Sequence, residues 1–339
     1  MKYLKTAGMK KYAKAMGNVC SALSIVYVLA ALINTDPSVF QGLDWRLCLP
    51  VCAAGVALKS ITVWMSARAW CLWLECYAQK RCSRKEAFRV YARANIGKYL
   101  PGNVMHYVER NLFAGKLHLS QKQITAASLS EVAGLILAAF FIGILFGFEQ
   151  VRQVFFALLK KMPFLRVMQE NFFKRIKLDE GFPSAGNMSW MAGWGIGLPG
   201  VILAVCVIRW MQGIQGKRYF AARRFWNTFL LNLAIYAAVL VILGFILVPV
   251  CWCLGQRPDL QKAMQIIAAY TIAWVFGFVV PGAPGGIGVR EMALILLLTP
   301  VMGREFVGVS GTLHRLITIA GDAAVYLLWG RRQKQRKSL

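Results

Sequence analysis

Arginine and glutamate side chains inside otherwise apolar segments are the residues of this sequence best suited to chemistry. Arg110 follows Glu109, and Arg290 precedes Glu291. An ionised side chain in the middle of a bilayer is costly unless it is paired or hydrated, so such residues mark candidate functional sites. Because a guanidinium forms bidentate hydrogen bonds with phosphate oxygens, the two arginines are candidates for holding a lipid phosphate. The alternative is a structural ion pair between each arginine and its adjacent glutamate.

Three more charged residues lie in apolar segments. Glu131 is within residues 124–148, and both Arg315 and Asp322 are within residues 306–329. A Glu131–Arg315 pair would join the two halves of the chain, and the spacing of Arg315 and Asp322 places them on one helix face. These residues predict either a polar path for a headgroup or a set of interhelical salt bridges. Lys98 is expected to extend to the cytoplasmic interface. The candidate cavity residues are Arg110, Glu109, His106, Asn103, Arg290, Glu291, Glu131, Arg315 and Asp322.

Two Pro-Gly interruptions precede the arginines at matching distances. In each region the arginine comes nine residues after the first proline. A broken helix is tolerated in lipid only where protein or a water-filled cavity satisfies the freed backbone groups, so both regions predict re-entrant hairpins, at about residues 87–113 and 263–298. The glycines would either expose N–H groups to a headgroup oxygen or allow close helix packing. The expected breaks are Pro101, Gly102, Pro281, Gly282, Pro284, Gly285, Gly286 and Gly288.

Composition indicates how these residues are positioned. Of 339 residues, 58% are hydrophobic and only 16% are charged, against about a quarter charged in soluble domains. Apolar segments at residues 19–33, 47–77, 124–148, 188–208, 225–250 and 306–329 suit membrane-spanning helices. We therefore expect a single transmembrane domain over residues 1–339. Its fold class is an all-α polytopic membrane protein with six full spans and two re-entrant hairpins.

The distribution of positive charge predicts the topology. The formal net charge of +26 comes from basic residues between the apolar segments, which indicates contacts with anionic lipids and no nucleic-acid partner. The positive-inside rule places both termini in the cytoplasm, with residues 331–339 as a basic tail. Residues 149–187 are also basic, although the predicted topology places them on the side of the membrane opposite the cytoplasm. We therefore interpret them as an amphipathic connector on the membrane surface. No disulfides are expected, because most of the nine cysteines lie in apolar runs.

The two halves of the chain share one plan. Residues 1–148 and 188–330 each contain two spans, a hairpin and a further span, and the predicted topology gives the halves opposite orientation. This arrangement is the inverted repeat of many secondary transporters, in which broken helices meet near the midplane. The sequence therefore predicts a binding site between the two hairpins.

The two segments that contain the Pro-Gly interruptions also resemble a known protein family. The segments KYLPGNVMHYVER and VPGAPGGIGVRE resemble the lysylphosphatidylglycerol synthase transmembrane region, a flippase-like membrane module, over nearly the whole chain. The resemblance implies movement of a lipid between leaflets and a bacterial-type plasma membrane. Some members are fused to an aminoacyl-transferase domain, which has no counterpart here, so we expect no lysyl-lipid synthesis.

The function predicted from the sequence is therefore a lipid translocase. Its substrate would be a membrane phospholipid or a polyprenyl-phosphate lipid. One alternative is a membrane enzyme acting on a lipid-linked substrate. Another is a non-transporting subunit that positions a separate lipid-modifying enzyme, which predicts a cavity too closed for a headgroup. Motifs for ATP binding, zinc proteolysis and serine hydrolysis are missing from the sequence, and we expect no metal and no cofactor. A homo-oligomer is left open.

Overall fold

The computed structural model describes residues 44–99, 105–161, 223–279, 284–286 and 288–330. Within these ranges 91% of the residues are helical and there is no strand, which confirms the all-α class. Among the described residues, three helical stretches are long and apolar enough to cross a membrane: Trp45–Ala78, Gln121–Gly143 and Arg223–Cys253. They correspond to the spans predicted at 47–77, 124–148 and 225–250. The spans predicted at 19–33 and 188–208 lie outside the described residues.

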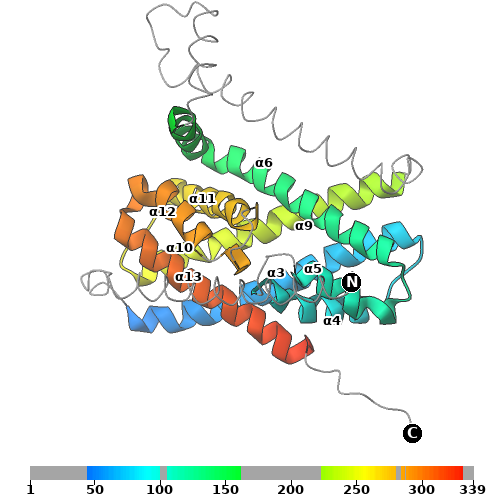
Figure 1. Ribbon diagram of the computed structural model, residues 1–339. Coiled ribbons are helices and arrows are strands. Elements are labelled where there is room, and N and C mark those ends of the chain that lie inside the picture. The colour runs from blue at the N-terminus through cyan, green and yellow to red at the C-terminus, as the bar shows by residue number, and fades with distance from the viewer. Residues whose placement is uncertain (1–43, 100–104, 162–222, 280–283, 287, 331–339) are drawn as a thin grey trace, which may run out of the picture.

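The long helices form a bundle that separates two groups of shorter ones. Helices α3 (Trp45–Ala78), α6 (Gln121–Lys161), α9 (Arg223–Phe245) and α13 (Arg304–Val325) run through the molecule. Figure 1 shows α11 and α12 on one side of this bundle and α4 and α5 on the other. A short helix, α10 (Leu247–Cys253), continues α9, and a π-helical turn, η4 (Tyr326–Gly330), continues α13. Together α13 and η4 cover the last predicted span, 306–329.

The helix that contains the third predicted span is longer than that span. The span was expected to end at residue 148 and to be followed by a surface connector over 149–187. In the structure α6 continues without a break to Lys161, so the described part of the connector is helical. The remainder of the connector and the basic tail at 331–339 lie outside the described residues.

Both predicted hairpin regions consist of helical segments on either side of the Pro-Gly interruption. In the first, α4 (Arg84–Asn95) leads into the 3-10 turn η1 (Ile96–Tyr99), and α5 (Met105–Phe113) with η2 (Ala114–Leu117) follows. In the second, α11 (Leu260–Val279) is followed by the turn η3 (Pro284–Gly286) and by α12 (Val289–Met302). The turns η1 and η3 contact each other, so the two interrupted regions meet inside the molecule.

Glycines allow the long helices to cross at short range. A Cβ atom on Gly55 would come within 2.6 Å of Ile317, where α3 crosses α13. A Cβ atom on Gly134 would come equally close to Tyr236, where α6 crosses α9. Membrane helices are known to approach closely at such small residues.

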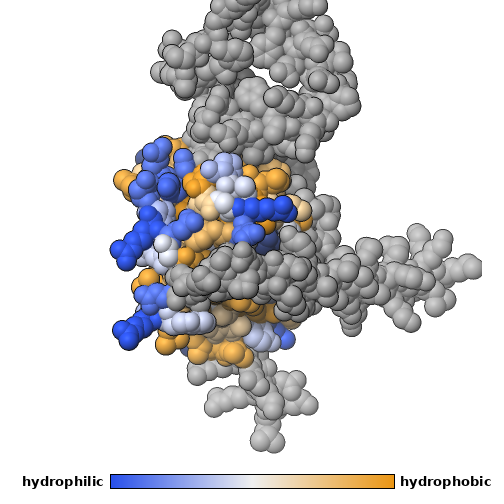
Figure 2. Space-filling view, turned by 90° about the vertical axis from the view of Figure 1, so that its left-hand side faces the viewer, coloured by the Kyte–Doolittle hydropathy of each residue, from blue (hydrophilic) through white to orange (hydrophobic). Residues whose placement is uncertain are grey.

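Large apolar side chains remain exposed on the outside of the bundle. Leu49 of α3 is 77% exposed, Leu145 of α6 is 73% exposed and Leu296 of α12 is 66% exposed. Figure 2 shows one face on which apolar patches alternate with hydrophilic residues that gather along one side. Soluble monomers rarely leave large apolar patches uncovered, so this surface agrees with a lipid environment.

Candidate functional site

A cavity of about 120 Å³ lies where the long helices and the two interrupted regions converge. Residues of α3, α4, α5, α6, α9, α11, α12 and α13 line it, together with the turns η1 and η3. Its lining is unusually rich in charge for the interior of an apolar bundle. The charged lining residues are Lys59, Lys98, Arg110, Glu131, Arg290, Arg315 and Asp322.

Arg110 and Glu131 form a buried ion pair between α5 and α6. The two side chains are 1% and 2% exposed, and Arg110 Nη1 lies 2.5 Å from Glu131 Oε2 while Nη2 lies 3.3 Å from Oε1. The Tyr91 hydroxyl donates to Glu131 Oε1 at 2.7 Å, and its ring lies under the guanidinium, 3.9 Å from Arg110 Cζ to the ring centroid. The charge of Arg110 is therefore compensated within the protein.

This pair corrects two of our expectations. Arg110 does not pair with Glu109, because adjacent residues of a helix do not face each other. The Glu109 carboxylate instead lies beside Gly97, where a Cβ atom would come within 2.5 Å of its Oε2, and Glu109 is not part of the cavity lining. The predicted Glu131–Arg315 pair is also wrong, since Glu131 is occupied by Arg110 and Arg315 has other partners.

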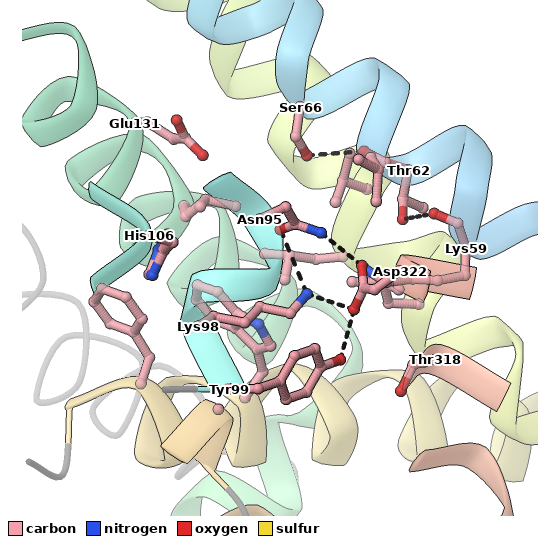
Figure 3. A pocket seen from close by; sticks show the side chains of 18 of the residues that line it. Lys59, Thr62, Ser66, Asn95, Lys98, Tyr99, His106, Glu131, Thr318 and Asp322 are labelled. Carbon is pink, nitrogen blue, oxygen red and sulfur yellow. Dashed lines mark hydrogen bonds and ion pairs between the residues drawn. The ribbon is translucent and has the colours of Figure 1, made fainter. Parts of the chain in front are cut away.

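Asp322 is the centre of a second buried cluster, shown in Figure 3. Its carboxylate, 1% exposed, lies 2.5 Å from Lys98 Nζ and 3.3 Å from Lys59 Nζ. It also accepts hydrogen bonds from Asn95 Nδ2 at 2.7 Å and from the Tyr99 hydroxyl at 2.6 Å. The expectation that Lys98 extends to the interface is wrong, because η1 turns its ammonium group towards Asp322. Four donors from three segments thus converge on one carboxylate of α13.

Arg315 connects α13 to the second interrupted region. Its Nη2 donates to the Gly285 carbonyl at 2.5 Å, and its Nε lies 3.9 Å from Glu291 Oε1. Glu291 Oε2 in turn accepts from the Gly288 N–H at 2.7 Å, which caps the start of α12. Glu291 therefore forms an ion pair with Arg315 and caps α12. The alternative in which it neutralises Arg290 is not observed.

The glycines of this region support close packing more than exposed N–H groups. Gly286 has φ +73°, and a Cβ atom there would lie 2.7 Å from the Gly277 carbonyl oxygen. Gly288 has φ +85° with open space around it, but its N–H is already bonded to Glu291. Both positions require glycine, one for contact with α11 and the other for its backbone conformation.

Arg290 lines the cavity without an acidic partner. No carboxylate of the described residues lies within ion-pair distance of it, and its buried Nε has no hydrogen-bond partner. Its nearest aromatic contact is the Tyr270 ring, 5.9 Å from Arg290 Cζ to the centroid. A cation in this position has hydrogen-bonding capacity left for an anion.

The formal charges of the described site do not cancel. Five cationic side chains line the cavity, and three carboxylates compensate them when Glu291 is counted with Glu131 and Asp322. The site therefore carries a surplus of two positive charges. His106 also lines the cavity, with its ring against Tyr107 and its buried Nδ1 unpaired, whereas His314 Nε2 is bonded to the Leu243 carbonyl at 2.8 Å.

Some residues of the site were not among the predicted cavity residues. Lys59 gave a usable signal, because it interrupts the apolar segment 47–77. Asn95, Tyr91 and Tyr99 gave none, since their types are ordinary at membrane boundaries. Asn103 and the breaks at Pro101, Gly102, Pro281 and Gly282 lie outside the described residues.

The donor types present suit anion binding more than metal binding. Among the described residues, no group of three or more His, Cys, Asp and Glu side chains is arranged to hold a metal ion. The chain matches no protein-family model and no curated protein, so its chemistry is inferred from the site itself.

Proposed function

We propose that the protein is a lipid translocase that moves a phosphate-bearing lipid between membrane leaflets. The lipid phosphate would bind in the cavity between two re-entrant hairpins, while its acyl or prenyl chains stay in the bilayer. The observation that carries this proposal is the surplus of positive charge, with Arg290 uncompensated among the described residues, inside an apolar helical bundle.

The energetics of burial support a bound anion. An unpaired cation in an apolar interior is costly, and such residues in membrane proteins typically face a substrate path. A guanidinium binds phosphate in a planar bidentate geometry, which makes arginine well suited to this ligand. A phosphate beside Arg290 would therefore accept hydrogen bonds from its guanidinium group and would also reduce the surplus positive charge of the cavity.

The arrangement of the elements supports alternating access. The turns η1 and η3 meet at the cavity, and Arg110 of α5 and Arg290 of α12 both line it. We infer six spans and two hairpins in an inverted repeat, with both termini cytoplasmic in a bacterial-type plasma membrane, as in the flippase-like family that the sequence resembles. Exposed basic residues at the start of α4, such as Arg84 and Lys85, would contact anionic headgroups.

A second candidate function is favoured by the size of the cavity. At about 120 Å³ it is smaller than typical ligand pockets, which span roughly 300–1,000 Å³. A non-transporting subunit that positions a lipid-modifying enzyme would need no larger space. The two functions differ in one property, namely whether the isolated protein moves lipid.

The experiment is a flipping assay in proteoliposomes that contain either fluorescent phosphatidic acid or fluorescent phosphatidylglycerol, with thermal unfolding measured on the same proteins. We expect the wild-type protein to move lipid, Arg290→Lys to be slower because bidentate geometry is lost, and Arg290→Ala to be slower still. Arg257→Ala is the matched control, since Arg257 is exposed in the turn between α10 and α11.

Two outcomes count against the proposal. Wild-type protein that moves no lipid would favour the subunit. Normal movement by a stably folded Arg290→Ala protein would remove Arg290 from the site.

A further inference from the structure

We propose that the cavity selects a terminal phosphate, as in a lipid phosphate monoester, over the phosphodiester of an ordinary phospholipid headgroup. This inference rests on the proposed function for the lipid nature of the ligand. It depends on three properties of the site, which are its charge, its size and its unpaired donors.

The charge of the site matches a dianion. Among the described residues, the three carboxylates leave two of the five lining cations uncompensated. A phosphate monoester carries about −1.5 to −2 charges at pH 7, whereas a phosphodiester carries only one. In a low-dielectric interior each uncompensated charge is costly, so the monoester neutralises the site and the diester leaves it positive.

The size of the cavity suits a phosphate group without a second substituent. A volume of 120 Å³ holds several water molecules, since one water needs about 10–15 Å³ of such space. A terminal phosphate, with one ester arm, can enter such a space end-on and leave its chain outside. A phosphodiester has arms on two sides, so a glycerol or sugar headgroup would also have to enter the cavity.

The unpaired donors match terminal phosphate oxygens. The Nε atoms of Arg290 and Arg315 are both buried and lack a hydrogen-bond partner. Arg315 is 6% exposed, and like Arg290 it lines the cavity. A monoester presents three terminal oxygens as strong acceptors, and a diester has one fewer, because the second ester bond uses it. The monoester therefore offers one more acceptor oxygen to the guanidinium groups of these two arginines.

The test is a binding measurement on the purified full-length chain in neutral detergent. Short-chain phosphatidic acid and short-chain phosphatidylglycerol with identical acyl chains are titrated and thermal unfolding is followed. Because the two lipids differ only in the second phosphate substituent, the ratio of their dissociation constants reports the preference directly. We expect phosphatidic acid to bind about tenfold more tightly or better, since the additional charge acts in a poorly screened interior.

Titration of inorganic phosphate in the same way shows whether the ligand is a soluble phosphate or a lipid phosphate. Binding as tight as that of phosphatidic acid would identify a soluble phosphate as a sufficient ligand. Weaker binding would show that the lipid chains contribute, as expected for a lipid substrate. Both results support recognition of a terminal phosphate.

The variant Arg290→Gln reduces the charge surplus from two to one. The preference for phosphatidic acid should then fall towards parity, whereas Arg257→Gln, which changes an exposed arginine outside the cavity, should leave it unchanged. If Arg290→Gln does not fold, Lys59→Gln makes the same change in the charge of the site. This variant should fold, because Asp322 keeps Lys98 as an ion-pair partner.

Equal affinity of the wild-type protein for the two lipids would overturn this inference and leave lipid translocation in place. A folded cavity variant that keeps the full preference would do the same. By contrast, a failure to move lipid in proteoliposomes would overturn the proposed function without affecting the measured preference.

Discussion

Removing the charge of Glu131 should destabilise the protein strongly, because its ion pair with Arg110 is fully buried. The variant Glu131→Gln keeps the shape of the side chain and an oxygen that accepts from Tyr91, now bonded to Glu131 Oε1 at 2.7 Å. What it removes is the negative charge 2.5 Å from Arg110 Nη1. Breaking one side of a buried pair costs about 3–5 kcal/mol, since the remaining charge is left uncompensated.

The expected shift in melting temperature follows from the length of the chain. With an unfolding entropy of about 2.1 cal/mol/K per residue, a chain of 339 residues loses roughly 1.4 °C per kcal/mol. The variant should therefore melt about 4–7 °C below the wild type in the same detergent. Glu305→Gln is the matched control, because Glu305 is exposed on α13 and its change should stay within about 0.5 kcal/mol.

A double variant separates charge burial from a general packing defect. In Arg110→Met/Glu131→Leu both charges are replaced by apolar side chains of similar volume, a change that is often neutral for buried pairs. We expect it to melt above Glu131→Gln. Two results would contradict this reasoning. Either Glu131→Gln has the same melting temperature as the wild type, or the double variant has a lower melting temperature than Glu131→Gln.

Three further predictions follow from other parts of the structure. Gly286→Ala should lower stability by roughly 1–3 kcal/mol in thermal unfolding, because its Cβ atom would lie 2.7 Å from a carbonyl oxygen of α11; Gly311→Ala, with no contact closer than 3.6 Å, is the control. Asp322→Asn should lower the melting temperature and slow lipid flipping, since two lysines lose their counter-charge; an unchanged protein would contradict the cluster. In a cysteine-free background, Lys262→Cys should react with an impermeant thiol reagent from outside and a cysteine at the C-terminus should not; the opposite pattern would reverse the topology.

The spans that the structure describes could be predicted because hydrophobic length is a local property. The segments at 47–77, 124–148 and 225–250 each contain enough apolar residues in a row to form a crossing helix. The end of α6 could not be predicted in the same way. Basic residues after residue 148 suggested a surface connector, but basic side chains are also compatible with a continuing helix.

The pairing of the site residues could not be predicted, because it depends on how the helices are rotated and packed. The sequence marked Arg110, Glu131, Arg315 and Asp322 as buried charges, and all four line one cavity. It did not give their partners, since Arg110 pairs with a residue of α6 instead of its neighbour. The direction of Lys98 was missed for a related reason, because one 3-10 turn is enough to redirect a long side chain.

The position of α13 gives a physical reason why a ligand in the cavity would affect the turns η1 and η3. Through Asp322 this helix holds Lys98 and Tyr99 of η1, and through Arg315 it holds the Gly285 carbonyl of η3. A phosphate bound in the cavity, as we propose, would compete with Asp322 for Lys98 and with that carbonyl for Arg315. A ligand shifts a conformational equilibrium only by binding one state better than another, and a state in which these contacts are released offers the phosphate more donors. Binding of the phosphate should therefore favour release of both turns from α13 together.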